Sequence, residues 1–296
     1  MKRSVRWSGA LALAFLPWVG GCALHTGAVV APAAAPVPPP LACRDIQGLD
    51  ALLTPGAGVL FGEMHGTAEI PAFLANAACL ALRAERPVTV ALEMPREDQA
   101  RVDAFLATAG SEADRRALLA SPFWTAEYQD GRRSQAMLNL LDEIRRRQRE
   151  GRKIRVKLVD RLDMPASPME RDRWMGEALA EAFGETPGGV VIALLGNLHT
   201  RISRGSPWDP DYEPTGFVLT NLKPELKVVS LDFSSPRGTA WFCTAADAAS
   251  CQVRPAGGRK DAAVDQVVLH PQVTNGHSGS YGVGSLTASP PARKEN

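Results

Sequence analysis

The stretch GVLFGEMHG, residues 58–66, joins a short apolar run to a polar turn that holds an acid and a histidine. Continuous apolar runs of this length are typical of strands that are buried on both faces of a parallel sheet. A second stretch, LLGNLHT at residues 194–200, has the same layout. Each run ends in glycine, two further residues and histidine, so His65 and His199 directly follow predicted strands.

Strand-like and helical segments alternate around these two stretches. The predicted strands cover residues 58–63, 87–93, 154–160 and 189–196. The predicted helices cover residues 69–85, 96–107, 111–120, 133–150 and 168–183. Apolar strands separated by helices are typical of parallel sheets with helical layers. We therefore predict an α/β fold with a mostly parallel central sheet flanked by helices on both faces.

The rest of the chain is different, because strand-like segments follow one another without intervening helices. They cover residues 217–222, 227–233, 239–244 and 265–271. We expect them to add C-terminal antiparallel edge strands to the sheet. Residues 43–288 are predicted to form a single α/β domain. The final residues, 289–296, are rich in proline and charge, and predict a disordered tail.

The N-terminus has the layout of an exported protein. Residues 1–21 combine a basic start, a short apolar run and small residues, which is typical of a secretory signal peptide. The apolar run of about ten residues is too short to span a membrane. The sequence VGGC at residues 19–22 resembles a bacterial lipobox, which predicts lipidation of Cys22. Ordinary signal cleavage without a lipid is the alternative.

A tether follows the predicted anchor. Residues 22–42 are rich in alanine and proline and contain no aspartate, glutamate, lysine or arginine, which favours a semi-rigid extended spacer. Cys22 is followed by Ala23 and not by aspartate, and this resembles the pattern of lipoproteins sent to the outer membrane. We expect a bacterial cell-envelope protein, lipid-anchored at the outer membrane and facing the periplasm.

Export changes the interpretation of the other four cysteines. Cys43, Cys79, Cys243 and Cys251 are an even number in an oxidising compartment, which allows three pairings. A bridge between Cys243 and Cys251 closes a short turn-rich segment, and that leaves Cys43 to pair with Cys79. Four reduced, buried thiols are the alternative. The cysteine and histidine spacing does not match a zinc motif.

The overall charge argues against one class of partner. The chain has 33 basic and 32 acidic residues, and 45% of its residues are apolar. A net charge of +1 provides no electrostatic basis for binding nucleic acid. We expect a globular domain that binds a small molecule or peptide.

Polar side chains follow each of the four predicted strands. Glu63 and His65 follow the first, Glu93 ends the second, Asp160 ends the third, and His199 follows the fourth. The carboxyl ends of parallel strands share one edge of a sheet, where ligands bind. Random placement gives about 0.4 pairs of the form Gly-x-x-His, whereas two of the five histidines match. The alternatives are that His65 caps the helix that begins near Glu69 and that His199 is a histidine of the core.

Two further features allow both a structural and a functional interpretation. In YQDGRRS, residues 128–134, Asp130 and Arg132 either project over this edge or belong to an ordinary Asp-Gly turn before a helix capped by Ser134. The aromatic side chains of Phe123 and Trp124, near Tyr128, either form a lid or cover the edge of the core.

Four segments together resemble the Tiki/TraB/ChaN superfamily, which also includes the erythromycin esterases. They are GEMHG, ALEMPREDQARVDAFL, RDRWMGEAL and LLGNLHT, and the resemblance covers most of residues 56–235. The second is most similar to the ChaN-like haem-binding, iron-regulated lipoproteins, whereas Glu69 after GEMHG is nearer the esterase branch. The resemblance implies six catalytic residues, namely Glu63, His65, Glu69, Glu93, Arg171 and His199.

The superfamily implies three kinds of activity. Tiki proteins are metal-dependent proteases, which would make His65, Glu93 and His199 metal ligands. Erythromycin esterases activate water with a histidine and a glutamate without a metal. ChaN-like lipoproteins bind haem, for which His65 and His199 would be the ligands. The cofactor is thus unknown, with a divalent metal ion and haem as candidates.

The leading hypothesis is a hydrolase in which His65, oriented by Glu63 or Glu93, is the general base for a water molecule. His199 would be a second proton-transfer group, and Arg171 would stabilise the developing anion. The alternative is a non-catalytic lipoprotein that binds haem or iron for uptake. A structural lipoprotein without either activity is a third possibility.

Overall fold

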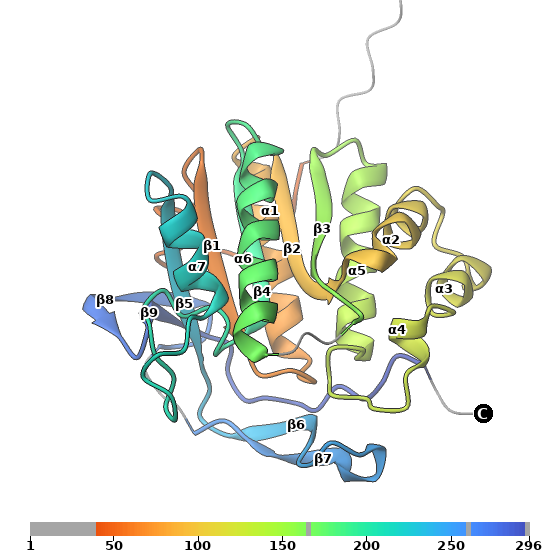
Figure 1. Ribbon diagram of the computed structural model, residues 1–296. Helices are drawn as coiled ribbons and strands as arrows, with labels where there is room; N and C mark the ends of the chain where they lie inside the picture. Colours follow the sequence, from red (N-terminus) through yellow and green to blue (C-terminus); the bar gives the residue numbers. More distant parts are fainter. Residues whose placement is uncertain (1–39, 164–166, 259–261, 294–296) are drawn as a thin grey trace, which may run out of the picture. The chain divides into compact units, whose positions relative to one another are not determined.

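The computed structural model describes residues 40–163, 167–258 and 262–293. The predicted signal peptide, Cys22 and the tether up to residue 39 lie outside the described residues. The strands of the main sheet are β1 (Ala57–Glu63), β2 (Val88–Pro95), β3 (Ile154–Asp160), β4 (Val190–Gly196), β5 (Lys227–Ser234), β8 (Gln266–Thr274) and β9 (His277–Gly282). They lie in the order β3-β2-β4-β1-β5-β9-β8 (Figure 1).

The sheet is mostly parallel, as predicted. All neighbours from β3 to β9 pair in parallel, and only β8 runs antiparallel, at the edge beside β9. The sequence placed β5 among the antiparallel strands, which is wrong, because β5 pairs in parallel with β1. Two further strands, β6 (Gly238–Cys243) and β7 (Cys251–Ala256), form a separate antiparallel hairpin.

Helices cover both faces of the sheet. Their bounds are α1 (Glu69–Arg83), α2 (Gln99–Leu106), α3 (Glu112–Leu118), α4 (Pro122–Thr125), α5 (Gln135–Arg149), α6 (Pro168–Gly184) and α7 (Thr215–Leu222), with 3₁₀ turns at Arg96–Asp98 and Ala248–Ser250. Strand side chains alternate, so Val59 and Phe61 of β1 pack with α1 and α5, whereas Leu60 packs with α6 and α7. Figure 1 shows α6 and α7 in front of the sheet and α1 and α5 behind it.

Helix α7 corrects the predicted strand at residues 217–222. The sequence FVLTNL is apolar and includes β-branched residues, which locally favours a strand. The segment instead packs on α6 at Gly176, where an added Cβ would come within 2.6 Å of a methyl carbon of Val218. This close helix–helix contact buries Val218 and Leu219, so tertiary packing overrides the local preference.

The C-terminal segment corrects the predicted tail. Ser289 is buried, its amide donates to the carbonyl of Gly66, and its hydroxyl accepts from the amide of Ala136. Further along, the amide of Ala292 donates to the carbonyl of Arg133. Residues 289–293 are therefore part of the domain, because long-range backbone contacts hold a segment whose composition suggests disorder.

Both predicted disulfides are present. Cys43 pairs with Cys79, which links the segment before β1 to α1. Cys243 pairs with Cys251 across the β6–β7 hairpin, where the two residues lie opposite each other. Among the described residues, no helix is both long enough and apolar enough to cross a membrane.

Candidate active site

Five of the six predicted catalytic residues come together at one edge of the sheet. Glu63 ends β1 in register with Gly196, the last residue of β4. Glu93 lies near the end of β2, and Asp160 ends β3. These strands are neighbours, so their carboxyl ends form one polar rim, which lies toward the β6–β7 hairpin in Figure 1.

His65 lies between two carboxylates. Its Nδ1 is 2.9 Å from Oε1 of Glu63, and its Nε2 is 3.6 Å from Oε2 of Glu93. Burial disfavours the charged ring, but the two carboxylates outweigh it and raise the pKa of His65 to about 10. The His65 side chain is 23% exposed, compared with 3% for either glutamate. His65 is thus a protonated group that reaches toward solvent.

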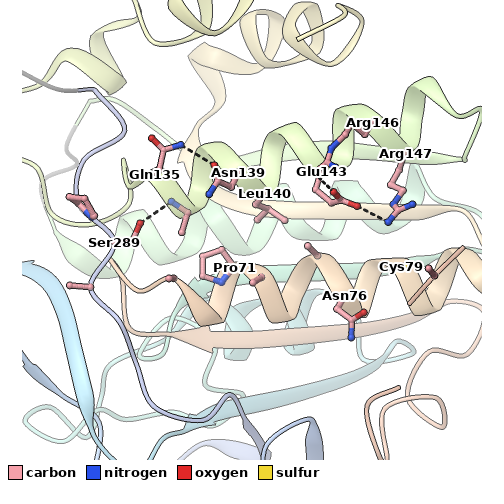
Figure 2. Close-up of a pocket in the computed structure, with 17 residues that line it drawn as sticks. Pro71, Asn76, Cys79, Gln135, Asn139, Leu140, Glu143, Arg146, Arg147 and Ser289 are labelled. Carbon is pink, nitrogen blue, oxygen red and sulfur yellow. Dashed lines mark hydrogen bonds and ion pairs between the residues drawn. The ribbon is translucent and has the colours of Figure 1, made fainter. Parts of the chain in front are cut away.

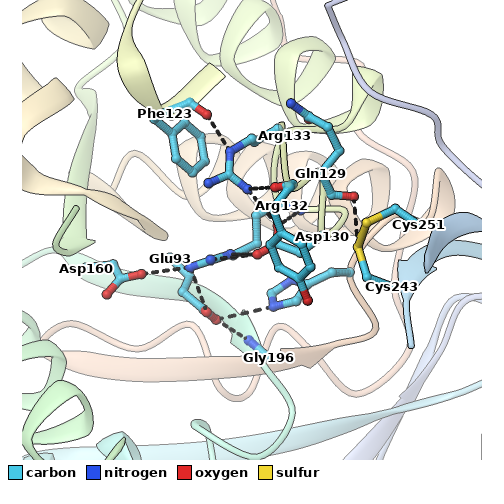
Figure 3. Close-up of polar contacts among 12 residues, drawn as sticks. Glu93, Phe123, Gln129, Asp130, Arg132, Arg133, Asp160, Gly196, Cys243 and Cys251 are labelled. Carbon is cyan, nitrogen blue, oxygen red and sulfur yellow. Dashed lines mark hydrogen bonds and ion pairs between the residues drawn. A yellow bond between two sulfur atoms is a disulfide. The ribbon is translucent and has the colours of Figure 1, made fainter. Parts of the chain in front are cut away.

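Glu93 is the buried centre of the cluster. One oxygen accepts a 2.6 Å hydrogen bond from Nη2 of Arg171, and the other accepts a 2.7 Å bond from the amide of Gly196. Burial opposes ionisation, but the charges of Arg171 and His65 hold the pKa of Glu93 well below its usual range. Figure 3 shows Glu93 with Asp160 and Gly196 around it.

Two arginines neutralise the buried acids. Arg171 binds Asp160 with two hydrogen bonds, from Nε at 3.0 Å and from Nη2 at 2.6 Å. Arg132 Nη1 lies 2.8 Å from Asp160 and 3.5 Å from Glu93. The pKa of each arginine is raised, because the neighbouring carboxylates outweigh the cost of burial. Buried carboxylates that are paired in this way keep their charge.

His199 has a different pair of neighbours. Its Nε2 is 3.1 Å from Nη1 of Arg171, and its Nδ1 is 2.7 Å from Oδ1 of Asp172. An arginine can only donate, so Nε2 accepts and the ring proton is on Nδ1. His199 is therefore a neutral imidazole, in contrast to His65.

The rings of His65 and His199 both lie close to Gly196. A Cβ added at this glycine would lie 3.2 Å from Nε2 of His65, 3.4 Å from Oε2 of Glu93 and 3.4 Å from Cδ2 of His199. A side chain at residue 196 would therefore crowd both histidine rings.

The loop before α5 reaches the site, as one of the two interpretations of residues 128–134 predicted. Arg132 also binds Asp130, from Nη2 at 2.6 Å and from Nε at 2.9 Å. Nε1 of Trp241 in β6 donates to the carbonyl of Gln129. Sγ of Cys243 lies 3.5 Å from the same oxygen, and Figure 3 shows Cys243 beside Gln129. The hairpin thus holds the loop that carries Arg132.

Neighbouring residues of this segment have structural roles. Ser134 caps α5 through its hydroxyl, which accepts from the amide of Met137. Phe123 and Trp124 are fully buried, so they cover the core and are not a lid. Tyr128 is partly exposed, and its carbonyl accepts from Arg133.

Glu69 is the predicted catalytic residue that the structure does not bring to the cluster. It begins α1, and its carboxylate accepts a 2.8 Å hydrogen bond from the amide of Thr287. An acid in the first turn of a helix also interacts favourably with the helix dipole. Glu69 therefore anchors the C-terminal segment, which sequence spacing alone does not reveal.

Sequence reasoning missed three residues that support His199. They are Asp172, Tyr212 and Thr215, which form one hydrogen-bonded group with its ring. Asp172 directly follows Arg171, so an acid beside the predicted arginine was an available signal. Tyr212 and Thr215 lie in the segment leading into α7, which sequence patterns treated as a strand, and no local signal identified them.

The cluster does not fit the metal site that the resemblance implied. Arg171 occupies the ligand atoms of both Glu93 and His199, so a divalent cation would have to displace a guanidinium. In the described part of the chain, no group of three or more histidine, cysteine, aspartate or glutamate residues is arranged to hold a metal ion. Haem fits no better, because ligation needs a free imidazole nitrogen. His65 is protonated, and Nε2 of His199 is bound to Arg171.

A mostly apolar hollow lies away from this rim. A cavity of about 550 Å³ separates α1 from α5 and is bordered by the C-terminal segment (Figure 2). Its lining includes Pro71, Asn76, Gln135, Leu140 and Ser289, and none of the predicted catalytic residues. The titratable groups converge at the polar rim instead, which makes the rim the candidate site.

Comparison with known proteins supports the fold. No family model and no curated protein matches the chain. A histidine-to-asparagine mutant of the erythromycin esterase EreC, in its open conformation, is similar with a TM-score of 0.57 and 12% identity over 85% of this chain and 99% of that chain. A succinoglycan biosynthesis protein has a TM-score of 0.52 and 8% identity, over 81% of this chain and 90% of that chain. At such identities the likeness shows a shared fold alone.

Proposed function

We propose that the protein is a hydrolase of the esterase-like branch of the Tiki/TraB/ChaN superfamily. Its fold is shared with an erythromycin esterase, and its motifs for both histidines, Glu63, Glu93 and Arg171 are present in the order that the superfamily requires. The observation that carries the proposal is the placement of a protonated His65 and of His199, whose Nε2 is an acceptor, beside Gly196 at the ends of neighbouring strands. A proton donor and a proton acceptor in one site are what hydrolysis of an ester or amide needs.

The proton states assign opposite roles to the two histidines. Nε2 of His199 takes a proton from the attacking water, whose oxygen bonds to the carbonyl carbon of the substrate. Nε2 of His65 gives its proton to the leaving group as the carbon–heteroatom bond breaks. The sequence-based hypothesis made His65 the base. Its position between Glu63 and Glu93 favours the acid role instead, because both carboxylates retain its proton.

Arg171 has a second role in this scheme. In the free protein its Nη1 donates to Nε2 of His199, so the water must displace this hydrogen bond before His199 acts. The released Nη1 donor then lies beside the reacting carbon and stabilises the developing oxyanion. The other nitrogens of Arg171 remain bound to Asp160 and Glu93, so the group keeps its position.

The test is hydrolysis of a small set of substrates by the purified full chain. We expect turnover of p-nitrophenyl acetate, p-nitrophenyl butyrate or a macrolide lactone, and an alkaline loss of kcat/KM near the pKa of His65, about 10. His270→Gln, on the edge strand β8, is the control and retains activity. No turnover of any carboxylic ester, lactone or peptide, or an absorbance shift with haemin that His65→Gln removes, would contradict the proposal.

We propose in addition that Cys22 carries a lipid and that the domain faces the periplasm. The two disulfides support an oxidising compartment, because such bridges are rare in the bacterial cytoplasm. Expression in a Gram-negative host with labelled palmitate tests this. We expect a labelled outer-membrane protein, and loss of the label with Cys22→Ser. A protein that remains in the cytoplasm would contradict it.

A further inference from the structure

Asp172 is a buried acid whose role the chemistry described so far leaves open. It lies on α6 directly after Arg171, and no part of it is exposed. Its Oδ1 accepts from Nδ1 of His199 at 2.7 Å and from the amide and hydroxyl of Thr215 at 2.8 and 2.6 Å. Its Oδ2 accepts from the hydroxyl of Tyr212. Four donors converge on this one carboxylate.

Asp172 is buried and does not form an ion pair with the arginine next to it in the sequence. Arg171, its neighbour in sequence, turns to Asp160 and Glu93 and makes no hydrogen bond to Asp172 among the described contacts. The charge of Asp172 is thus balanced by hydrogen-bond donors alone, and burial of an ionised carboxylate requires such donors. The one ring among these donors is that of His199, which is also bound to Arg171.

The ring of His199 is fixed from both sides. Asp172 accepts at Nδ1, and Arg171 donates at Nε2. Only the neutral ring with its proton on Nδ1 satisfies both contacts, since a proton on Nε2 would face the guanidinium. When His199 accepts a proton, two counter-charges are already in place, namely Asp172 at 2.7 Å from Nδ1 and Glu93 at 3.9 Å from Nε2.

We propose that Asp172 is a positioning residue, which holds His199 as the Nδ1-protonated imidazole and stabilises its charged form when the ring accepts a proton. Tyr212 and Thr215 hold Asp172 in turn, and both come from the segment that leads into α7. The catalytic part of this inference rests on the proposed hydrolase, whereas the proton position on His199 does not. The two can therefore be tested separately.

The first experiment measures the proton position without any substrate. We use the purified full chain with ¹⁵N-labelled histidine at pH 7, and assign the His199 signals with His199→Gln. We expect the proton of His199 on Nδ1 and none on Nε2. A proton on Nε2, or on both nitrogens, in the wild-type protein would overturn the inference, whatever the enzyme assays show.

Two substitutions then separate the two tasks of Asp172. Asp172→Asn keeps an acceptor for Nδ1, so we expect the same proton position and a loss of kcat on the order of 10²-fold with KM nearly unchanged. Asp172→Ala removes the acceptor, so we expect protonated Nε2 to appear and kcat to fall by on the order of 10⁴-fold. An alanine variant with unchanged proton position and unchanged kcat would refute the role.

Matched controls separate positioning from folding. Asp98→Asn removes another buried carboxylate, which accepts from Ser121, and we expect the His199 signals and kcat to stay as in the wild type. Tyr212→Phe removes one donor from Asp172 but leaves Nδ1 of His199 bound, so kcat falls less than 10-fold. If Asp172→Ala does not fold, the wild-type signals and Asp172→Asn still decide the question. If the wild type hydrolyses nothing but carries the proton on Nδ1, the proposed function fails and the proton assignment holds.

Discussion

The turns after β1 and β4 have the same motif but hold their histidines in opposite states. Each turn follows a buried strand and reads glycine, two residues, histidine, and the two strands are neighbours in register. His65 lies between two carboxylates, whereas His199 is bound by one carboxylate and one guanidinium, with Glu93 farther away at 3.9 Å. The motif sets where each ring lies, whereas the hydrogen-bond partners, most of them from other segments, set where its proton is held.

The largest expected effect comes from removing either ring. We expect His65→Gln and His199→Gln each to lower kcat/KM by on the order of 10³-fold or more, because each removes one of the two proton-transfer groups. The double substitution is expected to cost little more than either single one, since the two act as a unit. Steady-state kinetics on the best ester substrate decide this, and full additivity would show that the rings act independently.

The stability of the fold should reveal the charge of His65. Below pH 6.5 its proton is bound in both the folded and the unfolded chain, so the stabilisation is complete. Between pH 6.5 and about 10 only the folded chain keeps the proton, so this contribution is lost as the pH rises. We expect the difference in unfolding free energy between wild type and His65→Gln to shrink by on the order of 4 kcal/mol over this range. Urea unfolding at several pH values measures it, and a constant difference would contradict the assignment.

A smaller effect is expected from Glu63→Gln. This change removes one of the two carboxylates that retain the proton of His65, and we expect the pKa of His65 to fall by on the order of 1 to 2 units. The alkaline limit of kcat/KM should move down by the same amount. NMR titration of labelled histidine measures the first quantity. An unchanged titration of His65 would mean that Glu93 alone sets its charge.

The smallest of these effects is expected from a substitution at Gly196, beside the two histidine rings. Gly196→Ala adds a methyl group within 3.4 Å of three site side chains and meets no backbone atom among its nearest neighbours. We expect kcat/KM to fall about 10-fold while the unfolding midpoint shifts little, because the backbone tolerates alanine here. Gly184→Ala, at a glycine with open space around it, is the control. Equal activities of the two variants would place the reaction elsewhere.

Much of the site could be predicted because local signals coincide with topology. A buried strand followed by a polar turn indicates the end of a strand, and parallel strands deliver such turns to one edge. Glu63, His65, Glu93 and His199 were predicted on this basis and lie together. Glu69 is not bound to this group, and a spacing of four residues after His65 cannot show that a distant amide, that of Thr287, binds its carboxylate.

The missed features share one physical cause, which is dependence on long-range contacts. Residues 217–222 have the local pattern of a strand, but packing against Gly176 makes them helical. Strand β9 is rich in glycine and serine, so its local preference is weak, yet β5 and β8 pair with it on both sides. Neither partner is near in the chain, and no window of sequence contains the interaction.

The sequence by itself determined the α/β architecture, the two histidine turns and the pairing options of the cysteines, because these depend on short-range periodicity and on counting. Tertiary structure alone decided which charges meet. Arg132, Asp172 and Tyr212 reach the site from three separate segments: Arg132 binds Asp160, Tyr212 binds Asp172, and Asp172 binds the ring of His199. Electrostatic and hydrogen-bond energies act through space, so identical motifs acquire different chemistry only when the fold has placed their partners.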